Sequence, residues 1–389
     1  MSTDSLLEPA VSIAQLDLGS LLQTVFQPEP GEKICILIDL EDPMLMKDYS
    51  FVKNNPELKS QYHAYNSFYV PLRRHVLSKL GLKGGDMFAY RSTGGSNLDF
   101  LDDEVVDKDG HTKSLKADIF GGYDIILCIG TFSATAPLTA AAKIYGFRGA
   151  TMHGLNEVIL ESGLCVDYEE VSRVAELMRK AMSGFDEAVL HFRYDRVDYS
   201  LIIGLSGQEA QKSHGLCRDG FDIANLPAGE IYFVPTDANG KFPYRFKDGT
   251  IAIMEVIAGK IVRAVHDCGN RDLVNAFNER LQEDPETGTI GELGFGTQEL
   301  PVSGSDIQDE KILGTMHIAT GRSDHLGGSL TPDRFAKREN ATHDDILFSR
   351  EKTPEVSTVD VMLIKESTRR LIIIQNEPSN WIGTVRVGQ

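Results

Sequence analysis

Two residues near the end of the chain have the types and spacing of metal ligands. His343 and Asp345 are two residues apart in the segment THDDILF. On a β-strand, positions i and i+2 face the same side, so both side chains could reach one cation, while Asp344 would point to the opposite side. One histidine and one carboxylate do not complete a site, and the pair therefore calls for further ligands.

Three further candidates lie upstream of this pair. His317 lies in the apolar segment LGTMHIATG, where a lone histidine is more often a hydrogen-bonded core residue. Glu292 lies between glycines in GELGFG, and Glu230 begins the strand-like segment EIYFVP. Burying a carboxylate in such a setting is costly unless it is paired or binds a metal. We therefore predict that Glu230, Glu292, His317, His343 and Asp345 form one metal site.

The predicted set combines carboxylate oxygens with imidazole nitrogens, which suits Zn, Co, Mn or Fe(II). Three carboxylates and two imidazoles are enough for two divalent ions that share one carboxylate. Such ions lie about 3.5–4 Å apart and activate a water molecule between them. The competing interpretation is that the five residues are unrelated residues of the core and of turns.

The elements that must position these residues change character along the chain. Strand-like and helical segments alternate up to about residue 185, which predicts an α/β N-terminal domain over residues 1–187 with a mostly parallel sheet. Short apolar runs predict buried strands at 33–39, 123–130 and 148–152. Apolar residues at helical spacing predict helices at 10–26, 66–81 and 167–182, with a further helix after the loop TFSAT.

In the second half, strand-like segments follow one another, separated by turn residues and with few helical segments between them. We predict a β-rich α+β domain over residues 188–389 that carries the metal site, with one clear helix at 273–282. The predicted strands are EAVLHF, YSLIIGLSG, EIYFVP, GTIAIMEVI, KIVRAVHD, VDVMLIKES and RRLIIIQ.

Two loops of the first half resemble ligand-binding loops, but their residues indicate structural roles. The loop Thr131–Thr135 follows a predicted strand at the end where sites of parallel sheets lie. It lacks the glycine spacing of nucleotide-binding loops, so we expect its Ser and Thr residues to cap the next helix.

The segment DDEVVDKDGH resembles a calcium loop, but Val105 occupies a ligand position and no glutamate closes it. It therefore predicts a hairpin turn around Asp109-Gly110.

The composition narrows the range of partners and compartments. The formal net charge is −18, and an acidic surface repels nucleic acid and anionic membranes, so neither is expected as a partner. The cysteines are scattered and form no CxxC pair, which indicates reduced thiols. The N-terminal segment lacks the basic start and apolar run of a signal peptide, and no long apolar run follows. We therefore expect a cytoplasmic protein.

The chain resembles the metallo-aminopeptidases that include the thermophilic leucyl aminopeptidases and aminopeptidases S and T. The resemblance covers most of the chain and implies that Glu230, Glu292, His317, His343 and Asp345 are metal ligands. It also implies two Zn or Co ions, a homodimer, an α/β domain followed by a β-rich domain, and removal of N-terminal amino acids from peptides. The segments that carry it, in the family's order, are PGEKICILID, YDIILCIGTFSATAPLTAAAKIYGFRGATM, VDYSLIIGLSG, NLPAGEIYFVP, GELGFGT, EKILGTMHIATG and the H-x-D pair.

One position departs from the family's pattern. The peptidases have a tyrosine seven residues after the histidine that matches His317, and that tyrosine is thought to stabilise the transition state. Asp324 stands there in this chain. An ionised aspartate would repel an oxyanion, so Arg322 or His325 would have to replace the tyrosine. The free amino group of the substrate is expected to be held either by one of the metal ions or by an acidic neighbour such as Asp324.

The leading hypothesis is a dinuclear metal-dependent aminopeptidase, or a related amide hydrolase, acting on a peptide or small amide with a free N-terminus. Glu292 is expected to take the proton of the attacking water and pass it to the leaving amine. One alternative is a mononuclear Fe(II) ring-cleaving dioxygenase of the dihydroxypyridine type, which would use His317, His343 and Asp345. Retention of Glu230 and Glu292 argues against it. The other alternative is a non-peptidase family member with an altered substrate.

Overall fold

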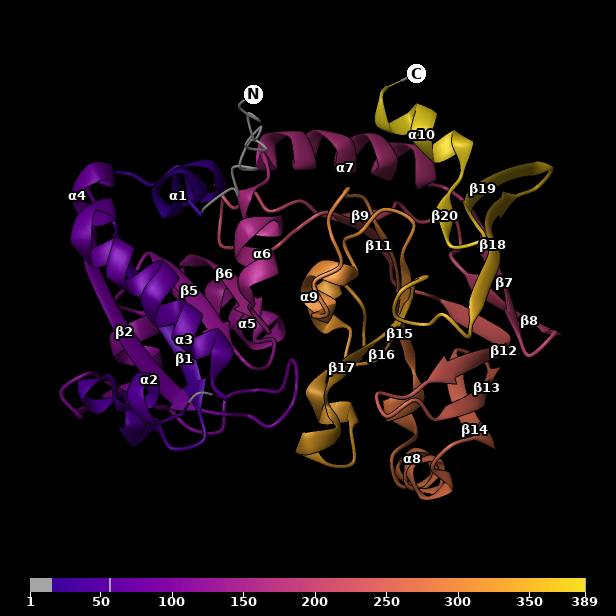
Figure 1. Cartoon of the computed structure of the whole chain (residues 1–389), viewed down its shortest axis with the longest axis horizontal. Coiled ribbons are helices and arrows are strands. Elements are labelled where there is room, and N and C mark those ends of the chain that lie inside the picture. The colour runs from indigo at the N-terminus through magenta and orange to yellow at the C-terminus, as the bar shows by residue number, and fades with distance from the viewer. Residues whose placement is uncertain (1–15, 56, 389) are drawn as a thin grey trace, which may run out of the picture.

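The computed structural model describes residues 16–55 and 57–388. They form a mixed α/β structure with three β-sheets, one of which is partly parallel. In Figure 1 the N-terminal part of the chain, in indigo and purple, lies on the left, and the segments in salmon, orange and yellow lie in the centre and on the right. The long helix α7 (Tyr168–Met182) crosses the top of this view between the two sides.

The first sheet has seven strands in the order β10-β6-β5-β1-β2-β3-β4 and is parallel from β10 to β2. The strands predicted at 33–39, 123–130 and 148–152 are confirmed as its central strands. Successive residues of 33–40 enter two different apolar cores, so both faces of the sheet are buried. The strands are β1 (Lys33–Leu40), β2 (Lys83–Arg91), β3 (Glu104–Val106), β4 (Thr112–Ser114), β5 (Ile125–Gly130), β6 (Arg148–His153) and β10 (Ile223–Asn225).

The predicted helices of the first half are present with shifted ends. The helix predicted at 10–26 is α1 (Leu18–Phe26), and residues 10–15 lie outside the described residues. The one predicted at 66–81 lies within a longer helical stretch that includes two π-helical segments. In α7, Asp167 caps the N-terminus by accepting a hydrogen bond from the Glu169 N–H. The other helices here are α2 (Ser50–Asn54), α3 (Lys59–His63), α4 (Leu77–Leu80), α5 (Thr135–Tyr145) and α6 (Glu157–Glu161), with π-helices Ala64–Tyr69, Leu72–Val76 and Leu115–Phe120.

The second sheet is antiparallel, with eight strands in the order β14-β13-β12-β8-β7-β18-β19-β20. It contains all the strands predicted in the second half except EIYFVP, and the helix predicted at 273–282 is α8 (Arg271–Glu283). Strand β12 was not predicted, because its sequence DANGKFPYR contains Gly and Pro and few apolar residues. The strands are β7 (Glu187–Tyr194), β8 (Val197–Gly204), β12 (Asp237–Arg245), β13 (Ile251–Ile257), β14 (Lys260–Cys268), β18 (Ser357–Lys365), β19 (Thr368–Ile374) and β20 (Glu377–Pro378), followed by α10 (Asn380–Arg386).

The third sheet is antiparallel, with five strands in the order β17-β16-β15-β11-β9. One of its faces packs into an apolar core that it shares with the second sheet. The residues that face this core include Ile231, Phe233, Leu293, Phe295, Met316, Ile318, Ile346 and Phe348. The strands are β9 (Gln211–Ser213), β11 (Glu230–Phe233), β15 (Ile290–Gly296), β16 (Met316–Gly321) and β17 (His343–Phe348), and α9 (Asp306–Asp309) lies in the connection between β15 and β16.

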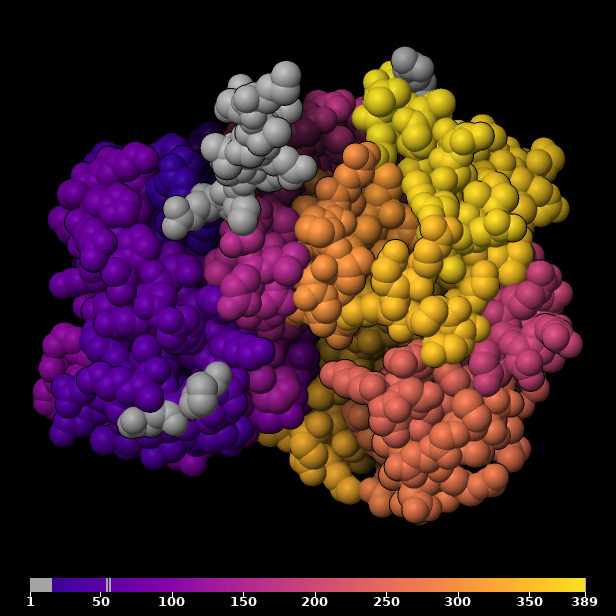
Figure 2. Space-filling view, in the orientation of Figure 1, coloured from indigo at the N-terminus to yellow at the C-terminus, as the bar shows by residue number. Residues whose placement is uncertain are grey.

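The division of the chain at residues 187 and 188 remains a prediction. Two elements link the parts on either side of it. Strand β10 lies beyond this point in the sequence but pairs with β6 in the first sheet. Helix α7 places Val171 in the core of the first sheet and Met178 in the core between the other two sheets. Figure 2 shows the two sides in contact over a long boundary. No helix within residues 16–55 and 57–388 combines the length and apolar character of a membrane span.

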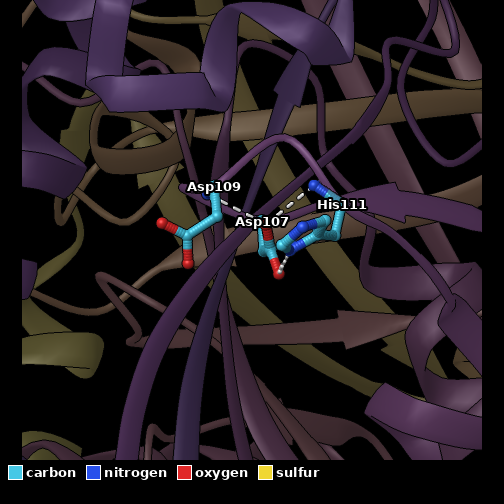
Figure 3. Close-up of side chains that lie close together, drawn as sticks. All are labelled: Asp107, Asp109 and His111. Atoms are coloured by element: carbon cyan, nitrogen blue, oxygen red, sulfur yellow. Dashed lines mark hydrogen bonds and ion pairs between the residues drawn. The ribbon is translucent and has the colours of Figure 1, made fainter.

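The predicted hairpin turn around Asp109-Gly110 is confirmed. Strands β3 and β4 pair antiparallel on either side of it. Asp107 Oδ1 accepts hydrogen bonds from the backbone N–H groups of Asp109 and His111, each at 2.9 Å (Figure 3). Gly110 has a φ of +82°, a conformation that favours glycine. The carboxylate of Asp107 therefore organises the turn, and the nearby acidic side chains need no bound cation to explain them.

Candidate metal centre

The five predicted ligands lie on one face of the third sheet, opposite its apolar face. Residues directly across an antiparallel ladder point the same way, so the pairing register decides which side chains meet. His343 and Asp345 lie on strand β17 and share this face, as predicted, whereas Asp344 points away and accepts a hydrogen bond from the Thr342 hydroxyl. The cross-strand pairs on the face are Glu230 with Gly296, Gly294 with His317, Glu292 with Ala319, Ala319 with Asp345, and Gly321 with His343.

Small residues fill the positions between the ligands on this face. Gly294 lies directly beneath the ring of His317. A Cβ atom at Gly294 would lie 2.1 Å from Cε1 and 2.2 Å from Nε2 of that ring. Gly294 of GELGFG therefore gives the His317 ring room to reach the carboxylates.

Gly294→Ala is expected to displace the His317 ring and weaken metal binding by about 10–100-fold, the usual effect of disturbing a ligand's orientation. The measurement is a metal titration against a competing chelator. Gly383→Ala is the matched control, because a Cβ at Gly383 meets nothing within 4 Å. Equal metal affinity in both variants would contradict the placement of His317 against Gly294.

Glu292 lies at the centre of the ligand set. Its Oε1 is 3.4 Å from His317 Nε2, and its Oε2 is 2.9 Å from His343 Nε2. Glu230 Oε2 lies 3.7 Å from His317 Nε2, and Asp345 Oδ1 lies 3.6 Å from His343 Nε2. The residues thus form two groups, each with its ligand atoms within 4.8 Å of one another, and Glu292 belongs to both.

Two buried charges that were not predicted from the sequence, Glu310 and Lys311, lie beside these ligands. Glu310 forms a third possible ligand group with His317 and Asp345. Lys311 Nζ lies 2.8 Å from Glu230 Oε2 and 2.5 Å from Glu310 Oε1. A signal for them was available: the two charges stand directly before the apolar segment ILGTMHI, where a buried charge requires a partner.

A backbone contact fixes the orientation of His343. Its Nδ1 lies 2.7 Å from the backbone carbonyl oxygen of Arg322. A carbonyl can only accept a hydrogen bond, so Nδ1 carries the proton and Nε2 is left to face Glu292. This is the tautomer that a metal ligand bound through Nε2 needs.

The structure places Asp324 in a different environment from the one expected. The guanidinium of Arg322 holds its carboxylate through two contacts, Nε to Oδ1 at 2.6 Å and Nη2 to Oδ2 at 3.2 Å. Burial acts to raise the pKa of Asp324, but Arg322 holds it below its usual range. Asp324 does not line the cavity beside the ligands, so no observed contact supports its predicted catalytic role.

Charge coupling among the ligands shifts their protonation. Burial acts to raise the pKa of Glu292, but the hydrogen bonds and charges of His317 and His343 hold it well below its usual range. Burial acts to lower the pKa of His317, but Glu292 raises it to about 9. The pKa of His343 is also raised, against the effect of burial, by Asp345 and Glu292. Without metal, both imidazoles are therefore protonated at pH 7.

Metal uptake at pH 7 is expected to release about two protons per chain, one from each histidine, because an imidazolium cannot bind a metal. Since the pKa values of both histidines are raised above their unfolded values, metal affinity should rise with pH above 7 as their protons are lost, and the His317 proton should be lost near pH 9. Calorimetric titration in buffers of different ionisation enthalpy measures the protons released. The His317→Ala variant should release about one fewer. Metal binding without proton release would contradict the charged state proposed for these histidines.

The ligand face borders a cavity of about 170 Å³ that residues from the first half also line. These residues follow the carboxyl ends of strands in the parallel sheet, where sites of such sheets lie. Ser133 and Thr135 belong to this wall. The expected capping of helix α5 is confirmed in part, because Ser133 Oγ accepts a hydrogen bond from the Thr135 N–H at 3.4 Å. The N-cap residue itself, Ala134, makes no side-chain cap, and the Ala136 N–H donates to Asn97 Oδ1. The lining residues from this side include Ser96, Asn97, Ser133, Thr135, Thr139 and His153.

Two further histidines line the cavity, and both are neutral. Burial lowers the pKa of His153, at the end of β6, to about 4. Burial and the neighbouring His343 lower the pKa of His325 to about 3. The ring of His325 meets that of His343 edge to face, with centroids 5.0 Å apart. Neither Nδ1 atom has a hydrogen-bond partner among the described residues. Both rings thus border the cavity, each with one buried nitrogen unpaired within the described part of the chain.

The donor set fits divalent cations. Glu230, Glu292 and Glu310 are each 6% exposed or less, and 27% of the Asp345 side chain is exposed. Among the ion pairs of the described residues, Lys311 is the only Lys or Arg within 4 Å of any of these carboxylates. Without metal, Lys311 and the two protonated histidines offset this negative charge. Histidines that bind metal must lose their protons, and the buried carboxylates then need further cations as partners. A metal cofactor is therefore plausible at this face.

Comparisons with known proteins identify the fold. No protein-family model matches the chain, and no curated protein sequence matches it. Two solved structures are similar over nearly the whole chain, each with 14% identity. One is 2,5-dihydroxypyridine dioxygenase from Pseudomonas putida KT2440, with a TM-score of 0.59 over 93% of this chain and 97% of that one. The other is wild-type AmpT from Thermus thermophilus, with a TM-score of 0.52 over 92% of this chain and 98% of that one. At this identity, the similarity shows a distant relationship in fold.

Proposed function

We propose that this protein is a metal-dependent amide hydrolase of the aminopeptidase type, with two cation positions that share Glu292. The observation that carries the proposal is that Glu292 belongs to two separate ligand groups, one with Glu230 and His317 and the other with His343 and Asp345. A carboxylate shared in this way is what a two-ion hydrolytic centre requires. The resemblance in sequence to the metallo-aminopeptidases and the fold shared with AmpT support the proposal.

Divalent ions bound at these groups would polarise the carbonyl of the substrate and lower the pKa of a water molecule. Both oxygens of Glu292 face histidine nitrogens, which suits a shared ligand better than the base that the sequence analysis expected. Glu310 is the better base. Burial raises its pKa, against the effect of Lys311, and Asp345 raises it further, so its carboxylate can take a proton and pass it to the leaving amine.

His325 is proposed to replace the tyrosine that the family has at the position of Asp324. A neutral imidazole in the cavity can donate a hydrogen bond to the oxyanion that forms during amide hydrolysis. His325→Phe keeps an aromatic ring against His343 but removes the donor. It is expected to lower kcat about 100-fold or more with bound metal unchanged. An unchanged kcat would assign oxyanion stabilisation to another group.

The test of the proposed function is hydrolysis of aminoacyl chromogenic amides and dipeptides by the full chain loaded with Zn or Co. Activity should depend on the metal and disappear with a chelator, and N-acetylated versions of the same substrates should not react. Metal-loaded protein that hydrolyses none of these substrates would reject the aminopeptidase proposal. A homodimer and a substrate with a free N-terminus are part of the same proposal.

A second candidate is a ring-cleaving dioxygenase that holds one Fe(II) with His317, His343 and Asp345. It is favoured by the fold shared with 2,5-dihydroxypyridine dioxygenase and by the pairing of Lys311 with Glu230, which engages one carboxylate that a two-ion centre would use. Oxygen uptake by the anaerobically iron-loaded protein, on addition of a dihydroxypyridine, would replace the hydrolase proposal with this one.

A further inference from the structure

We propose that Lys311 is a built-in cation that makes the two metal positions unequal. The position formed by Glu292, His343 and Asp345 binds an ion tightly, and the position formed by Glu230, Glu292 and His317 binds one weakly. The inference rests on the proposed function only in assuming that divalent ions bind these two ligand groups.

The geometry places the lysine at one position and not at the other. Its Nζ lies 2.8 Å from Glu230 Oε2, the same oxygen that faces His317 Nε2 at 3.7 Å. An ammonium group at hydrogen-bond distance competes for that oxygen and repels a second cation nearby. Within the described residues, no Lys or Arg lies within 4 Å of Glu292 or Asp345. Only the position that contains Glu230 is therefore weakened.

Lys311 cannot easily move its charge away. Its side chain is 1% exposed, so the ammonium group has no route to solvent without a local rearrangement. Its backbone is held on both sides, since its N–H donates to the Gln308 carbonyl at 2.9 Å and its carbonyl accepts from the Gln298 N–H at 2.8 Å. A Cβ at Gly296 would lie 2.6 Å from its carbonyl carbon, which shows how closely strand β15 packs against it. The charge is thus a fixed part of the site.

The formal charges explain why this matters for a second ion. With both ions bound, Glu230, Glu292 and Asp345 contribute −3, the two divalent ions contribute +4 and the metal-bound histidines are neutral, which gives +1. Lys311 raises this sum to +2, and Glu310 beside it lowers the sum by one only when it is ionised. Lys311 therefore adds to the net positive charge that a second ion creates in a buried site, and buried net charge is unfavourable.

The experiment is a titration of the metal-free full chain with Co(II) against a competing chelator, in wild type and in Lys311→Met. Wild type is expected to bind the second ion at least about 10-fold more weakly than the first. The reason is the repulsion between the Lys311 ammonium group and the second ion, since like charges placed side by side cost several kcal/mol. Lys311→Met should reduce this difference to a few-fold. Lys212→Met is the matched control, because Lys212 lines the cavity but pairs with Glu176, at 3.1 Å, and should behave as wild type.

Two variants test the same inference if Lys311→Met does not fold. Glu230→Gln should keep the tightly bound ion, and His343→Ala should lose it. Equal affinities for both ions in wild type, an unchanged second affinity in folded Lys311→Met, or loss of the first ion in Glu230→Gln would overturn the inference. The readout is ion binding, so the two proposals fail separately. Unequal binding without hydrolysis rejects only the proposed function, whereas equal binding with hydrolysis rejects only the role of Lys311.

Discussion

Glu292→Gln is expected to lose both bound metal and hydrolytic activity, whereas Glu310→Gln is expected to lose activity and keep its metal. The amide of Gln has the shape of the carboxylate but lacks its charge, and only Glu292 belongs to both ligand groups. Metal affinity in Glu292→Gln should fall by about 100-fold or more. Removing a residue that only orients a metal ligand already lowers affinity by about 10–100-fold, and Glu292 is itself a ligand. In Glu310→Gln, kcat should fall by about 10²–10⁴-fold, the usual contribution of a general base.

Metal content by elemental analysis, together with kcat on the same preparations, separates these two roles. Glu283→Gln is the control, because Glu283 is an exposed residue paired with Lys337 and lies outside the cavity lining. If Glu292→Gln kept its metal and lost only activity, Glu292 would be the base that the sequence analysis expected. If Glu310→Gln kept full activity, the proton transfer would belong to another group.

The strands and helices that carry strong apolar patterns could be predicted from the sequence. The buried run ICILI specifies a central parallel strand because every residue of it must be covered, and the observed strand β1 is buried on both faces. Strand β10 escaped prediction because three residues, IAN, are too few to show a period. It belongs to the first sheet because it pairs with β6, which lies far away in the sequence, and the local sequence of β10 does not predict that pairing.

The ligand face shows both what local patterns reveal and what they leave out. On β15 and β16, apolar residues of the core alternate with small residues or ligands, as in Leu293, Gly294 and Phe295. That alternation already implies one polar face on an otherwise buried sheet. Which ligands meet is decided by the register between strands, and a shift of one residue would turn His317 into the core. The register is a long-range property and could not be read from the sequence.

Residues that reach the site from outside the strands of this sheet were the hardest to predict. Glu310 and Lys311 come from the connection between β15 and β16, and their position before an apolar segment shows that they need partners but not that Glu230 is one of them. His153 comes from the end of a parallel strand in another sheet. It reaches the cavity because the carboxyl edge of the first sheet packs against the ligand face.

Arg322→Met is expected to lower the free energy of unfolding by about 3–5 kcal/mol, the usual cost of removing one partner of a buried ion pair. Arg322 is 2% exposed, and its guanidinium contacts Asp324 and, at 2.8 Å, both Asp99 Oδ1 and the Asn97 carbonyl. It thereby joins the cavity wall of the first half to the segment that orients His343. Methionine fills much of the same space but leaves the half-buried carboxylate of Asp324 without its partner.

The double variant Arg322→Met, Asp324→Asn decides what Asp324 does. If the aspartate serves to anchor Arg322, removing its charge as well should restore about 1–3 kcal/mol of the loss, the range expected for residues in direct contact. Chemical denaturation of the metal-free protein measures this. Asp324→Asn alone should then lower stability and leave KM unchanged, because the carboxylate faces Arg322 and not the cavity. A raised KM with unchanged stability would instead show that Asp324 holds the amino group of the substrate, and the anchoring role would be wrong. The first outcome makes Asp324 a structural partner of Arg322, and the second makes it a substrate-binding residue.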